Sequence, residues 1–316
     1  MSKKIALILA LLLLALPLAA CARPADDGRP SVVATLYPQY DFCKNIAGDE
    51  VSLTLLLPPG ADAHTYDPTP ADILTLSSAD LLIYTGAGME LWLDKLLAAK
   101  DVATAVESGS LRLLDLSETV DLLPLEEDGD EHEEETHDHG EFDPHIWTSP
   151  NCAAKMCDAI LNALIGINGE NEALYRTRHA AYTARLAALC DKVAALSPAA
   201  AGKTVYFGGS FAFTYLFADL SLSHRSLYNG CAAHTEPSPA AMTALIEEIS
   251  AAGAPAVLYD SPSEEKAAAK IAGETGAALL RLHAIHNISK EELERGEDYL
   301  SLTAQNLEIL GKAIGQ

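Results

Sequence analysis

The sequence predicts an α/β protein of two lobes, each with a parallel-type sheet flanked by helices, joined by one long rigid helix. Short apolar segments alternate with helical patterns in both halves of the chain, as is typical of parallel sheets. A continuous helical pattern at 170–196 separates the halves, and at 1.5 Å per residue it would be about 40 Å long, enough to cross the molecule. The 16 prolines and scattered glycines fit this alternation better than a helical bundle.

The first lobe is expected to span residues 31–168. Its first segment, at 31–36, reads as a buried strand, and Gly48 marks the end of the helix that starts after Pro38. Thr69 followed by Pro70 indicates a cap and the first turn of another helix. Strands are expected at 31–36, 51–57, 81–85 and 111–114, a further helix at 89–99, and a last helix capped by Ser149.

The linking helix is expected at 169–198, where Ser197 and Pro198 end the helical pattern, and the second lobe at 199–316. The alternation of strands and helices resumes there, which again favours a parallel sheet. Strands are expected at 204–207, 256–259 and 278–282, and helices at 211–220, 238–253, 263–275 and 298–313.

The N-terminus is typical of an export signal. Lys3 and Lys4 precede an apolar run at 5–20, which is too short for a comfortable membrane span. The run ends in Leu-Ala-Ala-Cys, which resembles a bacterial lipobox, so Cys21 is expected to carry a lipid after removal of residues 1–20. Residues 21–30 would be a flexible tether. We therefore expect an extracytoplasmic lipoprotein anchored to a bacterial membrane; an ordinary secretory signal with an incidental cysteine is the alternative.

Charge and cysteine content limit the possible partners. The net charge of −24 argues against binding to nucleic acid or to anionic lipid, and is compatible with attraction of cations. Apart from Cys21, the odd number of cysteines leaves at least one unpaired, and no CxxC spacing suggests a thiolate metal site. The sequence does not reveal how they pair; the cysteines concerned are Cys43, Cys152, Cys157, Cys190 and Cys231.

An acidic tract at 126–141 contains His132, His137 and His139 and lacks Lys and Arg. Solvation of an acidic loop would explain its charges, but the three histidines favour an accessory loop that collects zinc weakly. The tract is followed directly by Asp143-Pro144-His145, which reads as an ordered turn. The sequence thus places a metal-attracting tract beside a rigid histidine.

Four histidines outside this tract follow expected strand ends. His64 comes after the second strand, His145 lies in the loop before the helix capped by Ser149, and His283 and His286 come after the last strand. Because ligands of open parallel sheets bind beyond the carboxyl ends of the strands, we expect these histidines to share one site in the interlobe cleft. Adjacent carboxylates are the usual groups that fix the tautomer of a ligating histidine. His179, in the long helix, is expected to be exposed.

Two of these histidines lie in motifs that resemble a known family. Residues 58–72, PPGADAHTYDPTPAD, resemble the first metal-binding motif of the zinc and manganese ABC-transporter solute-binding lipoproteins (cluster A-I), which include the zinc-uptake periplasmic protein. Residues 143–147, DPHIW, resemble its second motif, and the acidic tract resembles the loop of zinc-specific members. The resemblance covers essentially the whole mature chain. It implies two α/β lobes joined by a rigid helix, with one metal ion between them.

The resemblance implies that His64 and His145 are metal ligands. Ser210 stands where the family has a third ligand, His or Glu, and serine is a poor zinc ligand. The family's fourth ligand falls near 283–286, where His286 continues the pattern better than His283. With serine at this position, the site would have three protein ligands and a water, or it would recruit a replacement ligand. The candidates for that replacement are Glu236, His234 and His224.

The expected function is capture of Zn(II) in the cleft and its delivery to the permease of an ABC importer with a cytoplasmic ATPase. Imidazoles suit Zn(II), whereas Mn(II) sites favour carboxylates. The chain is expected to be a monomer and not an enzyme. One alternative is a zinc-dependent hydrolase, since three histidines and a water also form catalytic sites, although HExxH and GxSxG are absent. Another is a metal-dependent surface adhesin, a cell-adhesion role attached to some members of the family.

Overall fold

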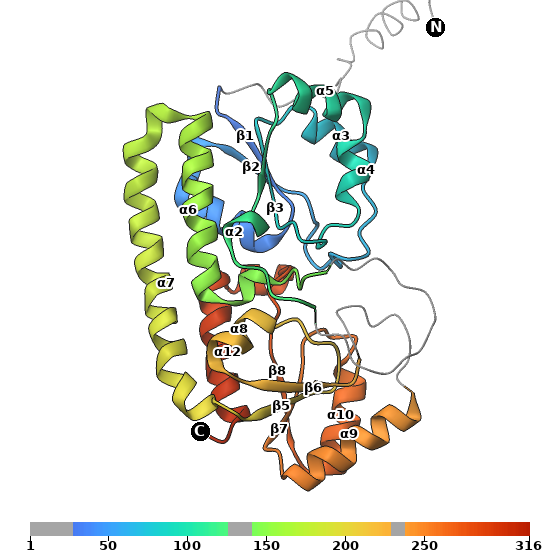
Figure 1. Cartoon of the computed structure of the whole chain (residues 1–316). Helices are drawn as coiled ribbons and strands as arrows, with labels where there is room; N and C mark the ends of the chain where they lie inside the picture. The colour runs from blue at the N-terminus through green and yellow to red at the C-terminus, as the bar shows by residue number, and fades with distance from the viewer. Residues whose placement is uncertain (1–27, 126–140, 229–237) are drawn as a thin grey trace, which may run out of the picture.

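The computed structural model describes residues 28–125, 141–228 and 238–316. Two α/β lobes lie one above the other beside a pair of long helices (Figure 1). These are α6 (Pro150–Ile167) and α7 (Glu172–Ala200), connected by the short 3-10 helix η4 (Gly169–Asn171). With 29 residues, α7 is about 43 Å long and runs beside both lobes. The predicted fold class is confirmed.

The N-terminal lobe contains a four-stranded parallel sheet in the order β2-β1-β3-β4. The helix after Thr69 starts as expected, because Thr69 and Asp72 form a reciprocal capping box. The helix expected at 89–99 is shorter, since α4 covers only 93–97, and a second helix, α5, which was not predicted, begins after the extended backbone of Ala99. The elements are β1 (Ser31–Ala34), α2 (Tyr37–Ala47), η1 (Gly48–Glu50), β2 (Ser52–Leu55), α3 (Pro70–Leu76), β3 (Leu81–Tyr84), α4 (Leu93–Leu97), α5 (Lys100–Ser108), β4 (Arg112–Asp115), η2 (Ser117–Thr119) and η3 (Ile146–Thr148).

The C-terminal lobe repeats this topology with a parallel sheet in the order β6-β5-β7-β8. Strand β6 was not predicted, because it is a four-residue edge strand of sequence Ser-His-Arg-Ser with no apolar pattern. His224 therefore lies in a strand and not in a connecting segment. The elements are β5 (Thr204–Phe207), α8 (Thr214–Leu220), β6 (Ser223–Ser226), α9 (Pro239–Ala252), β7 (Ala256–Tyr259), α10 (Glu265–Thr275), β8 (Ala278–Arg281), α11 (Lys290–Glu294) and α12 (Tyr299–Ala313).

One hydrophobic core extends through both lobes. It runs from Val32 in β1 past Leu186 in α7 to Phe207 in β5, all fully buried. Phe42 of α2 and Tyr299 of α12 contact each other edge to face with ring centroids 4.7 Å apart. Two smaller clusters lie on the outer faces of the sheets, under α3 to α5 in one lobe and under α9 and α10 in the other. The shared core joins the lobes as one packed unit.

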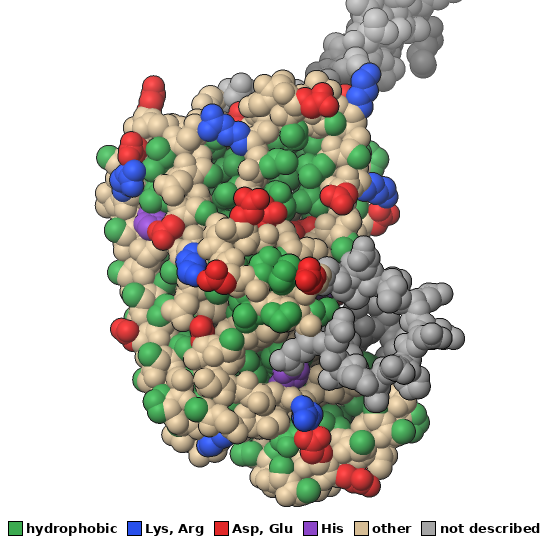
Figure 2. Space-filling model, viewed as in Figure 1, with side chains coloured by type: hydrophobic (Ala, Val, Ile, Leu, Met, Phe, Trp, Pro, Cys, Tyr) green, Lys and Arg blue, Asp and Glu red, His purple; other side chains and the backbone are tan. Residues whose placement is uncertain are grey.

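The surface carries acidic and basic side chains interspersed with apolar ones on the face shown in Figure 2. His179 is not exposed as expected: its side chain is 14% exposed and its Nε2 lies 2.9 Å from Asp158 Oδ1. Among the described residues, no helix is long and apolar enough to cross a membrane. The four described cysteines are unpaired thiols, namely Cys43, Cys152, Cys157 and Cys190, while Cys21 and Cys231 lie outside the described residues.

Candidate metal site between the lobes

A cavity of about 190 Å³ lies where loops from the two sheets meet. One wall is residues 60–62, which follow β2, and the other comprises residues from 260–262 and 281–292, which follow β7 and β8. The cavity therefore lies at the carboxyl ends of strands from both sheets, where open α/β sheets bind ligands. Its titratable lining residues are Asp62, Asp260, Arg281, His283, His286 and Glu292.

His64 lies in a loop whose backbone is held on both sides. Asp62 Oδ1 accepts hydrogen bonds from the backbone N–H of His64 (2.9 Å) and from the N–H and hydroxyl of Thr65 (2.9 and 3.0 Å). The Trp92 indole N–H donates to the carbonyl of Ala63 over 2.8 Å. Burial opposes ionisation of Asp62, but hydrogen bonds from Thr65 and the nearby His64 outweigh it, so the pKa of Asp62 is lowered. The loop thus presents an imidazole beside an ionised carboxylate.

His145 is buried and held by the carboxylate of Asp143. Asp143 Oδ1 accepts from the His145 backbone N–H (2.8 Å) and lies 3.0 Å from its Nδ1. Burial would raise the pKa of Asp143, but the charge and hydrogen bonds of His145 and the hydroxyl of Thr214 lower it. Because an ionised carboxylate only accepts, Nδ1 carries the proton and Nε2 is the nitrogen that a metal ion would use. This is the carboxylate–histidine pairing that surrounds many metal sites.

Asp143 is in turn fixed by the C-terminal lobe. The Thr214 hydroxyl, at the start of α8, donates to Asp143 Oδ2 over 2.6 Å. The Tyr215 hydroxyl donates to the Asp143 carbonyl over 2.7 Å and accepts from the N–H of Leu123 over 3.2 Å. The orientation of His145 therefore depends on contacts from both lobes.

The expected ligands are neighbours in the structure. The rings of His64 and His145 have centroids 5.6 Å apart. The half-buried His286 interacts electrostatically with His145 and Asp62, and its pKa is lowered chiefly by burial, with Asp260 opposing. Its imidazole is therefore neutral at neutral pH, the form that binds metal. Within the described ranges, however, no three His, Cys, Asp or Glu side chains are close enough to hold a metal ion as they stand.

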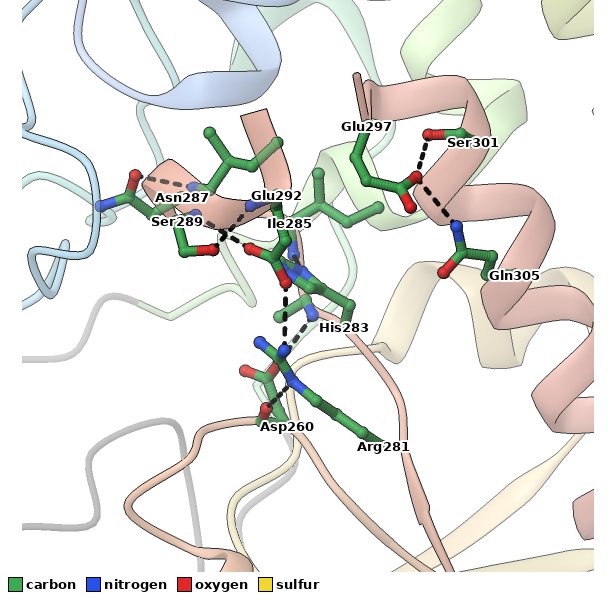
Figure 3. A network of polar contacts seen from close by, with 12 residues as sticks. Asp260, Arg281, His283, Ile285, Asn287, Ser289, Glu292, Glu297, Ser301 and Gln305 are labelled. Atoms are coloured by element: carbon green, nitrogen blue, oxygen red, sulfur yellow. Dashed lines mark hydrogen bonds and ion pairs between the residues drawn. The ribbon is translucent and has the colours of Figure 1, made fainter. Parts of the chain in front are cut away.

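His283, in contrast, has both ring nitrogens engaged in the cavity wall (Figure 3). Its Nδ1 accepts from the N–H of Ile285 over 2.9 Å, and its Nε2 lies 3.4 Å from Glu292 Oε1. The hydrogen bond with His283 is the main cause that holds the pKa of Glu292 well below its usual range. Arg281 donates to the same oxygen over 3.1 Å. These contacts favour His286 over His283 as the candidate ligand.

Ser210 lies next to a buried carboxylate that sequence reasoning missed. Its Oγ has no hydrogen-bond partner among the described residues although the residue is only 9% exposed. Its N–H donates to Glu264 Oε1 over 2.7 Å, and Oε2 accepts from the N–H of Ser261 over 3.4 Å. A side chain in place of Gly209 would collide with the Glu264 carboxylate unless that carboxylate moved, so glycine allows the two to approach closely. Both oxygens of Glu264 are thus committed to backbone groups.

Of the three expected ligands, only His286 lines this cavity in the described residues; His64 and His145 lie outside its lining, and the described replacement candidate lies elsewhere. The ring of His224 stacks on Phe211 with centroids 3.5 Å apart. It borders a separate cavity of about 450 Å³ that is also lined by Phe217 and Arg225. The remaining candidates lie outside the described residues: His132, His137 and His139 in 126–140, and His234 and Glu236 in 229–237.

Two tryptophans that sequence reasoning did not assign hold the cleft loops. Trp92 fixes the loop of His64, and the Trp147 indole N–H donates to the carbonyl of Ala284 over 2.7 Å. Trp147 is part of the Asp-Pro-His-Ile-Trp motif, so its closeness to His145 could be read from the sequence. Its partner Ala284, in the other lobe, could not.

Comparisons with known proteins agree on one family. The family described as zinc-uptake complex component A, periplasmic, matches residues 32–313. The zinc-binding lipoprotein AdcA of Streptococcus pneumoniae serotype 4 is 32% identical over 319 residues, covering 99% of this chain and 62% of that protein. The high-affinity zinc uptake system protein ZnuA of Bacillus subtilis is 30% identical over 306 residues, covering 92% of each chain.

The fold is also shared with a solved structure. The Zn(II)-bound ZnuA-like domain of S. pneumoniae AdcA superposes with a TM-score of 0.76 at 27% identity. That match covers 92% of this chain and 100% of the solved one. The present chain spans 62% of the length of the full S. pneumoniae AdcA protein, and so corresponds to part of it.

Proposed function

The chain belongs to the zinc-uptake complex component A family, and from this membership we propose that it is the extracytoplasmic solute-binding component of an ABC zinc importer. In this proposal it captures Zn(II) between its lobes with His64, His145 and His286. The observation that carries it is the closeness of His64 to His145, whose Nδ1 contacts Asp143, so that Nε2 would be the nitrogen that binds the ion.

The chemistry of the proposed ligands supports zinc over manganese. All three are imidazoles, which suit Zn(II), while Mn(II) sites draw mainly on carboxylates and water. A neutral His286 needs no deprotonation before it binds at neutral pH. Since serine occupies position 210, a water molecule or a neighbouring side chain would complete a tetrahedral zinc site. The cavity beside His286 has room for such water.

We further propose how the chain is located and what it meets. Residues 1–20 would be removed, Cys21 would carry the lipid anchor, and 21–30 would tether the lobes at 31–168 and 199–316, linked by 169–198, to the membrane. The partner would be a permease with its cytoplasmic ATPase, to which the monomer releases zinc. The tract at 126–141 would gather zinc weakly at His132, His137 and His139 and feed the tight site.

Calorimetric titration with Zn(II) and Mn(II), together with metal analysis of the purified protein, tests this function. We expect one tight zinc site in the wild type and weaker manganese binding. His64→Ala, His145→Ala and His286→Ala should each weaken zinc binding by at least about tenfold, because each removes a direct ligand and outer-shell changes alone cost about 10- to 100-fold.

His179→Ala is the matched control, since this histidine pairs with Asp158 away from the cleft and should leave zinc binding unchanged. If none of the three cleft variants lost affinity relative to this control, the ligand assignment would be wrong. If the wild type bound no zinc tightly, the transport proposal would fail. Hydrolytic turnover abolished by His145→Ala would favour the hydrolase alternative instead.

A further inference from the structure

Asn287 links the two lobes at the candidate site. It follows His286 in the C-terminal lobe, and its side-chain amide donates to the carbonyls of Pro58 (2.8 Å) and Ala61 (2.6 Å) in the N-terminal lobe. Its Oδ1 accepts from the N–H of Ile288 over 2.7 Å. The side chain thus uses both of its donors and an acceptor, and the residue is only 8% exposed.

The two carbonyls that Asn287 binds belong to the loop that carries His64. Asp62 and Trp92 hold this loop by hydrogen bonds from within the N-terminal lobe, and these hydrogen bonds do not reach the other lobe. The amide of Asn287, one residue from His286, joins the loop to the C-terminal lobe directly. Asn287 therefore lies between two proposed ligands that come from different lobes.

The backbone before Asn287 is strained and held in place. Ile285 has φ of +61° and is buried, a conformation that is rare for a β-branched residue and costs about 1–3 kcal/mol. The N–H of Ala284 donates to Asp260 Oδ1 over 2.7 Å, and the N–H of Ile285 donates to His283 (Figure 3). From the N-terminal lobe, the N–H of Tyr37 donates to the carbonyl of His286 over 3.4 Å. Such strain persists only where surrounding contacts hold the backbone in that conformation. The three hydrogen bonds above hold it on both sides of Ile285.

We infer that Asn287 is a positioning residue for zinc: it ties the loop of His64 to the segment that carries His286, so that ligands from the two lobes can converge on one ion. This inference rests on the proposed function. It acts through His64 and not by contact with the metal, because both amide hydrogens face carbonyls of that loop. An amide suits this position, since a carboxylate would bring negative charge against two carbonyl oxygens and could donate no hydrogen bond to them.

Zinc release and affinity test this role in the full mature chain. Zn(II) is bound to the wild type, Asn287→Ala and Asn287→Leu, its release into excess chelator is followed by stopped flow, and its affinity is measured by competition with a chromophoric chelator. We expect both variants to release zinc faster and bind it about 10- to 100-fold more weakly, the range seen for outer-shell partners of metal ligands. Leucine is similar in size to asparagine and makes no hydrogen bonds, so it separates the lost contacts from a cavity.

Asn168→Ala is the matched control, because Asn168 likewise donates its side-chain amide, in its case to the Tyr175 hydroxyl, at the far end of α6. It should lower thermal stability without changing zinc release. The double variant distinguishes a positioning role from a merely structural one. Once His64→Ala has removed the ligand that Asn287 positions, adding Asn287→Ala should weaken zinc binding by less than about threefold.

The outcomes separate the two proposals. If the wild type lacks tight zinc binding, the proposed function fails whatever Asn287 does. If the wild type binds zinc tightly but both Asn287 variants release it at the rate of Asn168→Ala, the positioning role is wrong and the function stands. The same holds if the effects of Asn287→Ala and His64→Ala are fully additive, since independent effects exclude action through the loop.

Discussion

Replacing Asp143 with asparagine tests whether a buried carboxylate tunes the zinc affinity of His145. Asparagine has the same shape, so its Oδ1 can still accept from the backbone N–H and Nδ1 of His145, now 2.8 and 3.0 Å from Asp143 Oδ1. Its amide nitrogen would face the Thr214 hydroxyl, which can accept in place of donating. The substitution therefore removes negative charge while the hydrogen-bond geometry is kept.

The expected loss follows from that charge. A hydrogen bond to a charged group contributes about 1 kcal/mol more than a neutral one, and the bond from His145 Nδ1 strengthens when zinc withdraws electrons from the ring. Loss of the attraction between the carboxylate and the bound cation adds a similar amount. Together these give about 2 kcal/mol, or roughly 30-fold weaker binding at 1.36 kcal/mol per tenfold change.

Zinc affinity by chelator competition measures this effect, with circular dichroism to verify folding. Asp158→Asn is the control, because Asp158 also contacts a histidine, His179, across 2.9 Å but far from the cleft. It should change affinity by less than twofold. Wild-type affinity in Asp143→Asn, beside a large loss in His145→Ala, would refute the tuning argument; unchanged affinity in both would remove His145 from the site.

Three further predictions concern stability, the acidic tract and the missing ligand. Burial, reinforced by Asp298 and opposed by the hydrogen bond from Tyr182, raises the pKa of Asp41 to about 6. The native state then binds more protons than the unfolded state between about pH 4 and 6, so stability falls as pH rises through this window, by up to roughly 3 kcal/mol. Asp41→Asn should remove this slope in urea unfolding; an unchanged slope would disprove it. Deleting 126–141 should abolish weak zinc binding in calorimetry and keep the tight site, and loss of the tight site would contradict the cleft assignment. Ser210→His should tighten zinc binding by at least about tenfold by adding an imidazole ligand; chelator competition that shows no gain would mean that position 210 does not face the ion.

Most of the fold could be predicted from the sequence, because strands such as β1 and β3 are short and mainly apolar and helices such as α3 start at strong caps. It failed where these signals are missing. Strand β6 has four polar residues at a sheet edge and forms only by pairing with β5, which no local pattern predicts. Helix α5 was not predicted either: it starts directly after the extended backbone of Ala99, where the expected helix ended, and no capping side chain marks its start.

The candidate site was predictable in its motifs and not in its supporting contacts. His64 and His145 stand in recognisable segments, and the structure brings their rings together. The choice between His286 and His283 depends on Glu292. Its carboxylate contacts His283 Nε2 only once α11 has packed beside His283. The link from Asn287 to Pro58 joins residues 229 positions apart, so it can be seen only once the lobes are placed.

Both tryptophans of the chain touch the backbone of the cleft, and this gives the protein a built-in optical probe. Trp147 is fully buried with its ring centroid 5.4 Å from that of His145, and Trp92 donates to the carbonyl that precedes His64. Since no other indole contributes, ultraviolet emission excited at the red edge of protein absorption comes from this region alone. Trp147→Phe and Trp92→Phe would assign the signal to one loop or the other, so cargo loading could be followed in real time without a label.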